Sequence, residues 1–185
     1  MRRYLLILAL LLIPSVAPLT YPGFIRALAT FLPVYRVADP GWNPLGEGGL
    51  LAYWLASALE KVGLSGPEAV KFTWALSLML GGTGAFFLAR HYGPNVALLA
   101  SALYVYSPFT LSAIYVRGEL EEPLFWGLLP WLFAALSFRI GTSWATFSAL
   151  AVSLLLALTH PGLAAFALAL GTAYSLLHRR WLFPA

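Results

Sequence analysis

The sequence predicts an all-α integral membrane protein, a bundle of six transmembrane helices with an amphipathic helix at the membrane interface. Composition is the first observation: 61% of the 185 residues are hydrophobic, only 10% are charged, and the mean hydropathy is +0.81. Soluble domains carry about a quarter charged residues, so the lipid bilayer is the expected solvent. The second observation is a series of apolar runs whose lengths approach the roughly 20 residues needed to cross a bilayer. The third is that the charged residues gather between these runs.

The residue content narrows the function classes further. The chain has no cysteine, which excludes a disulfide framework and a thiolate metal site. The pI near 9.6 suggests nucleic acid as a partner, but the basic residues are scattered between apolar runs and form no patch, so we exclude nucleic-acid binding. The absence of Gln and the scarcity of Asn and Met fit a thermophile as the source, although GC-rich codon usage explains them equally well.

The first predicted span covers residues 4–20 and follows the basic start Met1-Arg2-Arg3. It is short and contains Pro14 and Pro18. A secretory signal peptide is the alternative interpretation, with the small residues at 15–17 as a cleavage site. Pro18, directly after that site, argues against cleavage. In both interpretations the residues that follow lie outside the cytoplasm.

Residues 21–68 form the predicted outer loop. Up to residue 48 it is rich in Pro and Gly, shows no sustained period and is expected to be irregular. The stretch 50–64, LLAYWLASALEKVGL, is too short to span but has apolar residues at helical spacing, which favours an amphipathic helix at the interface. These apolar positions are Leu50, Leu51, Trp54, Leu55, Ala58, Leu59 and Val62. Residues 65–68, SGPE, then have the features of a helix start.

Five further spans complete the predicted bundle, which forms a single module over residues 1–185. They cover residues 69–89, 95–115, 123–138, 143–159 and 163–177. Gly81, Gly82, Gly84 and Ala85 give the second span a small-residue face, and such faces let helices in lipid approach closely. Pro108 is expected to kink or end the third span.

The charge pattern orients the bundle. With the N-terminus in the cytoplasm, the inner side receives only basic residues, namely Arg2, Arg3, Arg90, Arg139, Arg179 and Arg180. The outer side receives the other basic residues and every acidic one: Asp39, Glu47, Glu60, Glu68, Glu119, Glu121 and Glu122. Because Lys and Arg in short loops mark the cytoplasmic side, we expect a multi-pass protein of the inner (plasma) membrane with both termini in the cytoplasm.

Three stretches of the sequence carry a family resemblance. The first outer loop contains Asp39 followed by Trp42, the second stretch reads LYVYSPFTLSAIYVRGELEEPLFWGLLPW, and the third, LLLALTHPG, contains His160. In this order they resemble the GT-C superfamily of integral membrane glycosyltransferases. The match looks closest to the bacterial and archaeal membrane proteins described as related to 6-pyruvoyl-tetrahydropterin synthase. Arg117 and Glu122 stand where that family has Arg-Gly-x-x-x-Glu.

The resemblance implies a GT-C-like N-terminal module that takes a sugar from a polyprenyl-phosphate donor and transfers it outside the cytoplasm. In such enzymes an Asp in the first outer loop deprotonates the acceptor, sometimes beside a divalent metal, and here that residue is Asp39. Arg36 or Arg117 would hold the lipid phosphate, while Glu122 and His160 are the remaining candidates for substrate binding. No two His residues have metal-ligand spacing, so the residues themselves predict no metal site.

Other interpretations stay open. The family's members are several hundred residues long, so the chain resembles only their front part, and a fragment, a split gene or a reduced homologue without catalysis would each fit. Asp39 lies in a good turn sequence, and an interaction with a helix N-terminus explains two of the three Glu residues before the fourth span. A lone His at a helix end is usually a satisfied interfacial residue. The alternative function is a non-catalytic membrane subunit that packs against membrane protein partners in a larger complex.

Overall fold

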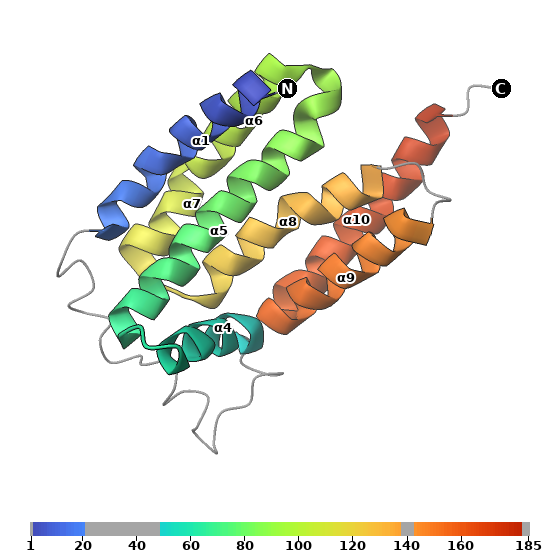
Figure 1. The fold of residues 1–185 in the computed structure, drawn as a ribbon. Coiled ribbons are helices and arrows are strands. Elements are labelled where there is room, and N and C mark those ends of the chain that lie inside the picture. The colour runs from blue at the N-terminus through green and yellow to red at the C-terminus, as the bar shows by residue number, and fades with distance from the viewer. Residues whose placement is uncertain (1, 21–48, 138–142, 183–185) are drawn as a thin grey trace.

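The computed structural model describes residues 2–20, 49–137 and 143–182, and all regular structure in these ranges is helical (Figure 1). In chain order the elements are α1 (Arg2–Val16), η1 (Ala17–Thr20), α4 (Leu50–Lys61), α5 (Gly66–Ala89), η2 (Arg90–Tyr92), α6 (Pro94–Val105), α7 (Pro108–Ser112), η3 (Ala113–Arg117), α8 (Glu121–Ser137), α9 (Ser143–Thr159) and α10 (Pro161–Leu182). A helix therefore stands at each of the six predicted spans, and α4 stands where the interfacial helix was predicted.

Local sequence accounts for where α5 begins. Ser65 is its N-cap, and the Glu68 carboxylate accepts hydrogen bonds from the Ser65 backbone N–H at 2.8 Å and from the Ser65 hydroxyl at 2.7 Å. Such a capping box satisfies amide groups that have no partner within the helix. The predicted helix start at residues 65–68 is confirmed.

The third predicted span is interrupted, as Pro108 suggested. α6 ends at Val105, and α7 begins at Pro108 with the Ser107 hydroxyl accepting a hydrogen bond from the Thr110 backbone N–H at 3.1 Å. A single π-helical turn, η3, follows directly and ends at Arg117. Proline has no backbone N–H to donate to a continuing helix, so the helix is broken before Pro108. The two short helical segments that follow end at Arg117, at the end of the bundle.

The helices run alternately up and down, so the connections fall at two opposite ends (Figure 1). One end carries η1, α4, the turn between η3 and α8, and the joint between α9 and α10; the opposite end carries the N-terminus and the connection from α5 to α6. All the described acidic residues belong to the first end: Glu60, Glu68, Glu119, Glu121 and Glu122. We call it the acidic end.

Small residues hold α5 close to its neighbours, as predicted. A Cβ added to Gly82 would lie 2.4 Å from Leu12 of α1 and 2.8 Å from Val105 of α6, and one added to Gly84 would lie 2.8 Å from Trp131 of α8. On α8, a Cβ at Gly127 would lie 2.6 Å from the backbone oxygen of Ser77. These contacts leave no room for side chains, so glycine is what allows the helices to approach this closely.

α1 belongs to this packing. Leu8 and Leu12 are buried, and the hydroxyl of Tyr106 donates a hydrogen bond to the Leu11 carbonyl at 2.8 Å. The Tyr115 hydroxyl donates a second one to the carbonyl of Ser15, the residue at which a cleavage site was considered. These contacts favour the interpretation in which α1 stays with the bundle.

α4 lies across the acidic end with an unexpected face inward. Its buried residues are Ala52, Tyr53, Ala56 and Ser57, whereas the apolar Trp54 and Val62 are 59% and 81% exposed. The helix is therefore attached to the bundle through small residues, Tyr53 and the part-buried Leu51 and Leu59, while the large apolar side chain of Trp54 faces away. This arrangement fits a helix whose outer side contacts lipid.

Three helical stretches are long and apolar enough to cross a membrane: Arg3–Thr20, Gly66–Tyr92 and Pro94–Arg117. The stretches Phe147–Thr159 and Pro161–Tyr174 are apolar but shorter within the described residues. The all-helical membrane character is thus confirmed, and six crossings stay a prediction.

Candidate functional site

The turn between η3 and α8 positions the charged residues of the acidic end. Gly118 has a φ of +66°, in the left-handed region that glycine adopts without strain. The buried indole of Trp74 on α5 donates a hydrogen bond to the backbone carbonyl of Glu119 at 2.7 Å, and Leu120 is buried. The backbone conformation of Gly118 and the hydrogen bond to the Glu119 carbonyl therefore hold the turn in place. The turn in turn determines where Arg117, Glu119 and Glu122 lie.

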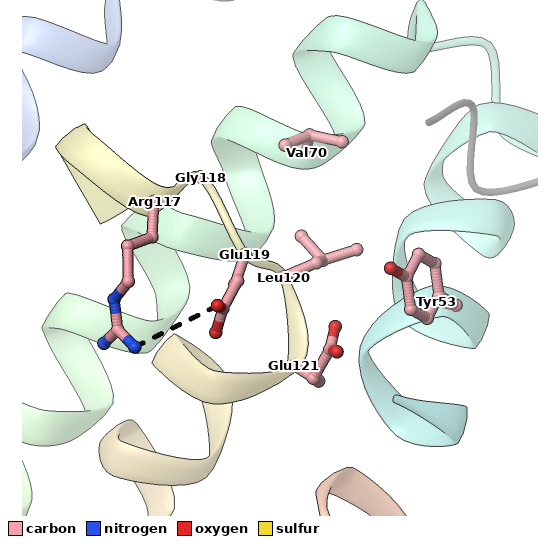
Figure 2. Close-up of a pocket in the computed structure, with 7 residues that line it drawn as sticks. All are labelled: Tyr53, Val70, Arg117, Gly118, Glu119, Leu120 and Glu121. Atoms are coloured by element: carbon pink, nitrogen blue, oxygen red, sulfur yellow. Dashed lines mark ion pairs between the residues drawn. The ribbon is translucent and has the colours of Figure 1, made fainter. Parts of the chain in front are cut away.

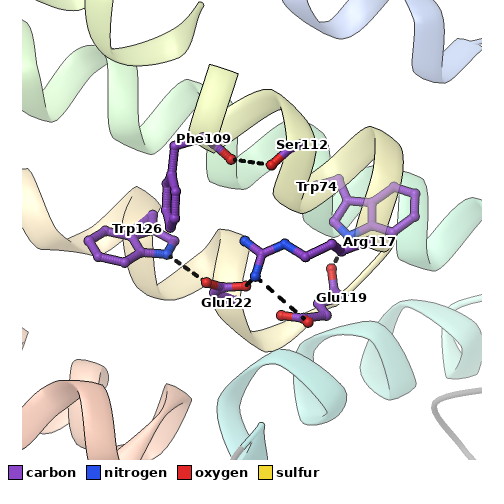
Figure 3. A network of polar contacts seen from close by, with 7 residues as sticks. All are labelled: Trp74, Phe109, Ser112, Arg117, Glu119, Glu122 and Trp126. Carbon is purple, nitrogen blue, oxygen red and sulfur yellow. Dashed lines mark hydrogen bonds and ion pairs between the residues drawn. The ribbon is translucent and has the colours of Figure 1, made fainter. Parts of the chain in front are cut away.

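Arg117 joins the two carboxylates (Figure 3). Its guanidinium lies 2.7 Å from Glu122 and 4.0 Å from Glu119, and it stacks over the Phe109 ring at 5.5 Å. The indole N–H of Trp126 donates to the other Glu122 oxygen at 3.3 Å. The Glu122 side chain is only 12% exposed, while those of Arg117 and Glu119 are 39% and 44% exposed. Glu122 is thus the inner member of the group, and Glu119 is the one open to solvent.

These environments separate the two carboxyl groups chemically. A hydrogen bond with Glu122, together with burial and the Glu122 charge, raises the pKa of Glu119 to about 7. The pKa of Glu122 is lowered, because the hydrogen bonds from Glu119 and Trp126 and the charge of Arg117 together outweigh burial, which acts in the opposite direction. Near neutral pH the pair therefore exchanges between a form with one negative charge and a proton on Glu119 and a form with both carboxyl groups ionised, in about equal amounts.

A cavity of about 190 Å³ opens beside this group (Figure 2). It is lined by Tyr53 of α4, Val70 of α5 and the turn residues Arg117, Gly118, Glu119, Leu120 and Glu121. Arg117 and Glu119 face each other on one side, and Glu121 and Tyr53 lie on the other (Figure 2). The lining thus combines a cation, two carboxyl groups, a phenol and two aliphatic side chains, which suits a ligand with both charged and apolar parts.

Two of the predicted substrate-binding residues meet at this site. Arg117 and Glu122 form the shortest ion pair described above, and Arg117 also lines the cavity. His160 instead belongs to the joint between α9 and α10, where its Nδ1 accepts a hydrogen bond from the Leu163 backbone N–H at 3.3 Å. It is part-buried near Phe125 and is not among the cavity-lining residues. Its contacts in this structure are those of a helix cap.

The other predicted site residues, Asp39 and Arg36, lie outside the described residues, so their roles stay predictions. The chain re-enters the described part at Gly49, whose N–H donates to the Thr159 carbonyl at 2.7 Å. A Cβ at Gly49 would lie 3.6 Å from the Cβ of Glu121, which places the residue before α4 beside the cavity. Within residues 2–20, 49–137 and 143–182 no group of three His, Asp or Glu side chains could hold a metal ion.

Glu119 lines the cavity but is not among the site residues predicted from the sequence. An interaction with a helix N-terminus explains two of the three Glu residues at this position, which leaves only Glu122 as a predicted substrate-binding residue. The useful signal was Gly118, because a glycine between Arg117 and Glu119 permits a left-handed turn that brings Arg117 back over the following carboxylates.

Comparison with known proteins gives a family but no detailed relative. No curated protein and no solved structure matches the chain. One family model, described as "6-pyruvoyl-tetrahydropterin synthase related domain; membrane protein", matches residues 49–182, a range that runs from the start of α4 to the end of α10 and includes the whole cavity. The chain therefore belongs to the 6-pyruvoyl-tetrahydropterin synthase related family of membrane proteins.

Proposed function

We propose that this protein is a GT-C-like membrane glycosyltransferase module that binds a polyprenyl-phosphate sugar at the acidic end and transfers the sugar to a hydroxyl acceptor. The observation that carries the proposal is the cavity in which Arg117 faces carboxyl groups at one end of an apolar bundle. Arginine binds phosphate oxygens through several directed N–H donors, carboxyl groups hydrogen-bond sugar hydroxyls, and the surrounding helices offer the apolar surface that a lipid tail needs.

The proposed reaction assigns a task to each group. The acceptor hydroxyl attacks the anomeric carbon, its proton passes to Asp39, and the bond between the anomeric carbon and the phosphate oxygen breaks. The electron pair of that bond leaves with the polyprenyl phosphate, whose charge Arg117 stabilises. Asp39 enters through the family resemblance, and the position of Gly49 beside Glu121 supports it, because Gly49 follows Asp39 by only ten positions in the chain.

The membrane arrangement is part of the proposal. Six crossings with both termini in the cytoplasm of the source cell would place the acidic end on the outer side of the inner membrane. The described acidic residues all belong to that end, and Arg3 and Arg90 belong to elements at the other. The excess of basic residues without acids at one end supports this orientation.

Sugar transfer by the purified full chain is the direct test. The protein in lipid nanodiscs is incubated with polyprenyl-phosphate sugars carrying a radiolabel in the sugar, and transfer to added hydroxyl acceptors is measured. Asp39→Asn should abolish transfer at unchanged yield and thermal stability, whereas Glu47→Gln, which removes an acid from the same loop, should retain it. Full turnover by Asp39→Asn removes Asp39 from the reaction.

A measurement of donor binding tests the proposal even if none of the added acceptors is a substrate. The wild-type chain should bind the donor lipid even when no suitable hydroxyl is present, and Arg117→Met should weaken this binding. A chain that binds no phosphate-linked sugar lipid, and that co-purifies in mild detergent with stoichiometric membrane partners, is instead a non-catalytic subunit.

A further inference from the structure

The pair Glu119–Glu122 presents a problem for phosphate binding at this site. A phosphate group in the cavity would meet Arg117, but Arg117 is already 2.7 Å from Glu122 and 4.0 Å from Glu119. If both carboxyl groups were ionised, the two negative charges would more than neutralise the guanidinium and repel an anion. An anion therefore needs one of the two carboxyl groups to be neutral.

Geometry selects Glu119 as the neutral one. Glu122 has the shorter contact to Arg117 and the Trp126 donor, and these favour its charged form strongly enough to outweigh its burial, which acts against it. Glu119 has the longer contact to Arg117, shares a hydrogen bond with Glu122 and lines the cavity. A carboxyl group that is held neutral can donate a hydrogen bond into a binding site.

The charged surroundings of Glu119 come from few elements. η3 contributes Arg117, and α8 contributes Glu121 and Glu122. α4 contributes Tyr53 to the cavity lining and α5 contributes Val70, while the charge of Lys71 acts on Glu68. Arg117 is the cation among the residues that line the cavity, so the protonation of Glu119 decides the charge that an incoming anion encounters.

We propose that Glu119 in its protonated form, together with Arg117, binds the phosphodiester of the sugar donor and delivers its proton to the departing phosphate oxygen. This inference rests on the proposed function. As the bond from the anomeric carbon breaks, the phosphate oxygen takes the electron pair and accepts the Glu119 proton, while the acceptor hydroxyl forms the new bond and loses its own proton to the base assigned in the proposed function. Solvent then returns a proton to Glu119, whose side chain is 44% exposed.

Binding of a phosphodiester at different pH values tests this inference without turnover. The probe is a short-chain polyprenyl-phosphate glucose, whose single phosphate charge does not titrate between pH 6 and pH 8. If only the form with Glu119 protonated binds, the dissociation constant should rise about tenfold between pH 6 and pH 8, because the competent fraction falls by that factor. The measurement is microscale binding to the full chain in nanodiscs of neutral lipid.

Two variants isolate the responsible group. Glu119→Gln keeps a hydrogen-bond donor that does not titrate, so it should bind at pH 8 as the wild type does at pH 6. Glu121→Gln, which removes a carboxylate from the same cavity, should retain the pH dependence, and so should Glu119→Asp. His160 is unchanged in all three variants, so a difference in pH dependence between them does not come from its imidazole. A Glu119→Gln chain that weakens like the wild type overturns the inference, and thermal unfolding at each pH excludes misfolding.

The remaining outcomes separate the inference from the proposed function. Wild-type binding that is equally strong at pH 6 and pH 8 overturns the role of Glu119 and leaves sugar-lipid binding standing. Absence of binding at both pH values overturns both. Phosphatidylglycerol added as competitor distinguishes the source of the phosphodiester: equal displacement by this lipid assigns the cavity to ordinary headgroups and overturns the assignment to the sugar donor.

Discussion

α5 and α8 meet in two regions that are built in contrasting ways. In the middle of the bundle Gly127 contacts the Ser77 backbone, and a side chain added there would overlap it. At the acidic end the turn that leads into α8 lies against α5, and a cavity of about 190 Å³ opens beside Arg117 and Glu119. In the first region the two helices pack backbone against backbone, whereas the second carries four charged residues within six positions. We call the close contact of α5 and α8 around Gly127 and Ser77 the seam. The contrast indicates that the seam is the rigid part of the bundle, on which the turn holds ionisable groups in place.

The largest expected effect is at the seam. Gly127→Val would place its Cβ 2.6 Å from the backbone oxygen of Ser77, which cannot move aside as a side chain can. Overpacking typically costs about 1–3 kcal/mol, and here we expect the upper end or loss of the folded protein. Thermal unfolding in detergent measures it. Gly162→Ala is the control, because a Cβ there meets only His160 at 3.8 Å.

The next effect is at the charged group. Arg117→Met leaves the 12%-exposed Glu122 carboxylate without its cation, and an unsatisfied buried group costs about 1–3 kcal/mol. Adding Glu122→Gln removes that charge and should restore part of the lost stability. A double-mutant cycle on the unfolding midpoints quantifies the coupling. Additive losses would show that Arg117 and Glu122 do not interact in the folded protein.

Two indole hydrogen bonds allow a matched comparison of the regions. Trp74→Phe removes the bond to the Glu119 carbonyl, and Trp131→Phe removes the bond to the Leu80 carbonyl at 2.9 Å. Each loss should cost about 1 kcal/mol. Only Trp74→Phe should also change the pH response of the acidic end, because it releases the turn that positions Glu119. If both variants changed that response equally, the seam and the turn would not be separable.

The smallest expected effect is the pH dependence of stability, because the Glu119 side chain is 44% exposed and solvent weakens its interactions. The pKa of Glu119 is raised from 4.5 to about 7 by folding, so the native state binds more protons than the unfolded state between these values. Stability should therefore fall as pH rises from about 4.5 to 7 and then level off. In the Glu119→Gln variant the unfolding midpoint should change less with pH over this range. A wild-type midpoint that rises across it would contradict the assignment of the proton to Glu119.

The sequence was most informative about where helices begin and end. The helix start at residues 65–68, the break at Pro108 and the small-residue face of α5 were all predicted, because each depends on residues that are neighbours in the chain or lie on one helix face. The inward face of α4 was not predicted. Its larger apolar residues suggested one face, but attachment to the bundle depends on space beside α5 and α8, which favours Ala52 and Ala56.

The candidate site was predicted in part for the same reason. The family resemblance selected Arg117 and Glu122 as candidates for substrate binding, and the structure joins them at 2.7 Å. The different roles of Glu119 and Glu121 could not be read from the chain, because they depend on the left-handed Gly118 and on Trp74, which lies 45 positions earlier. Asp39 and Arg36 lie outside the described residues, and their assignment still rests on resemblance.

The hydrogen bond from Gly49 to the Thr159 carbonyl has a mechanical consequence. It ties Gly49, the residue before α4, to the joint between α9 and α10, which lies 110 positions further along the chain. A tilt of the α9–α10 hairpin would therefore be transmitted to α4 and, through Tyr53, to the lining of the cavity.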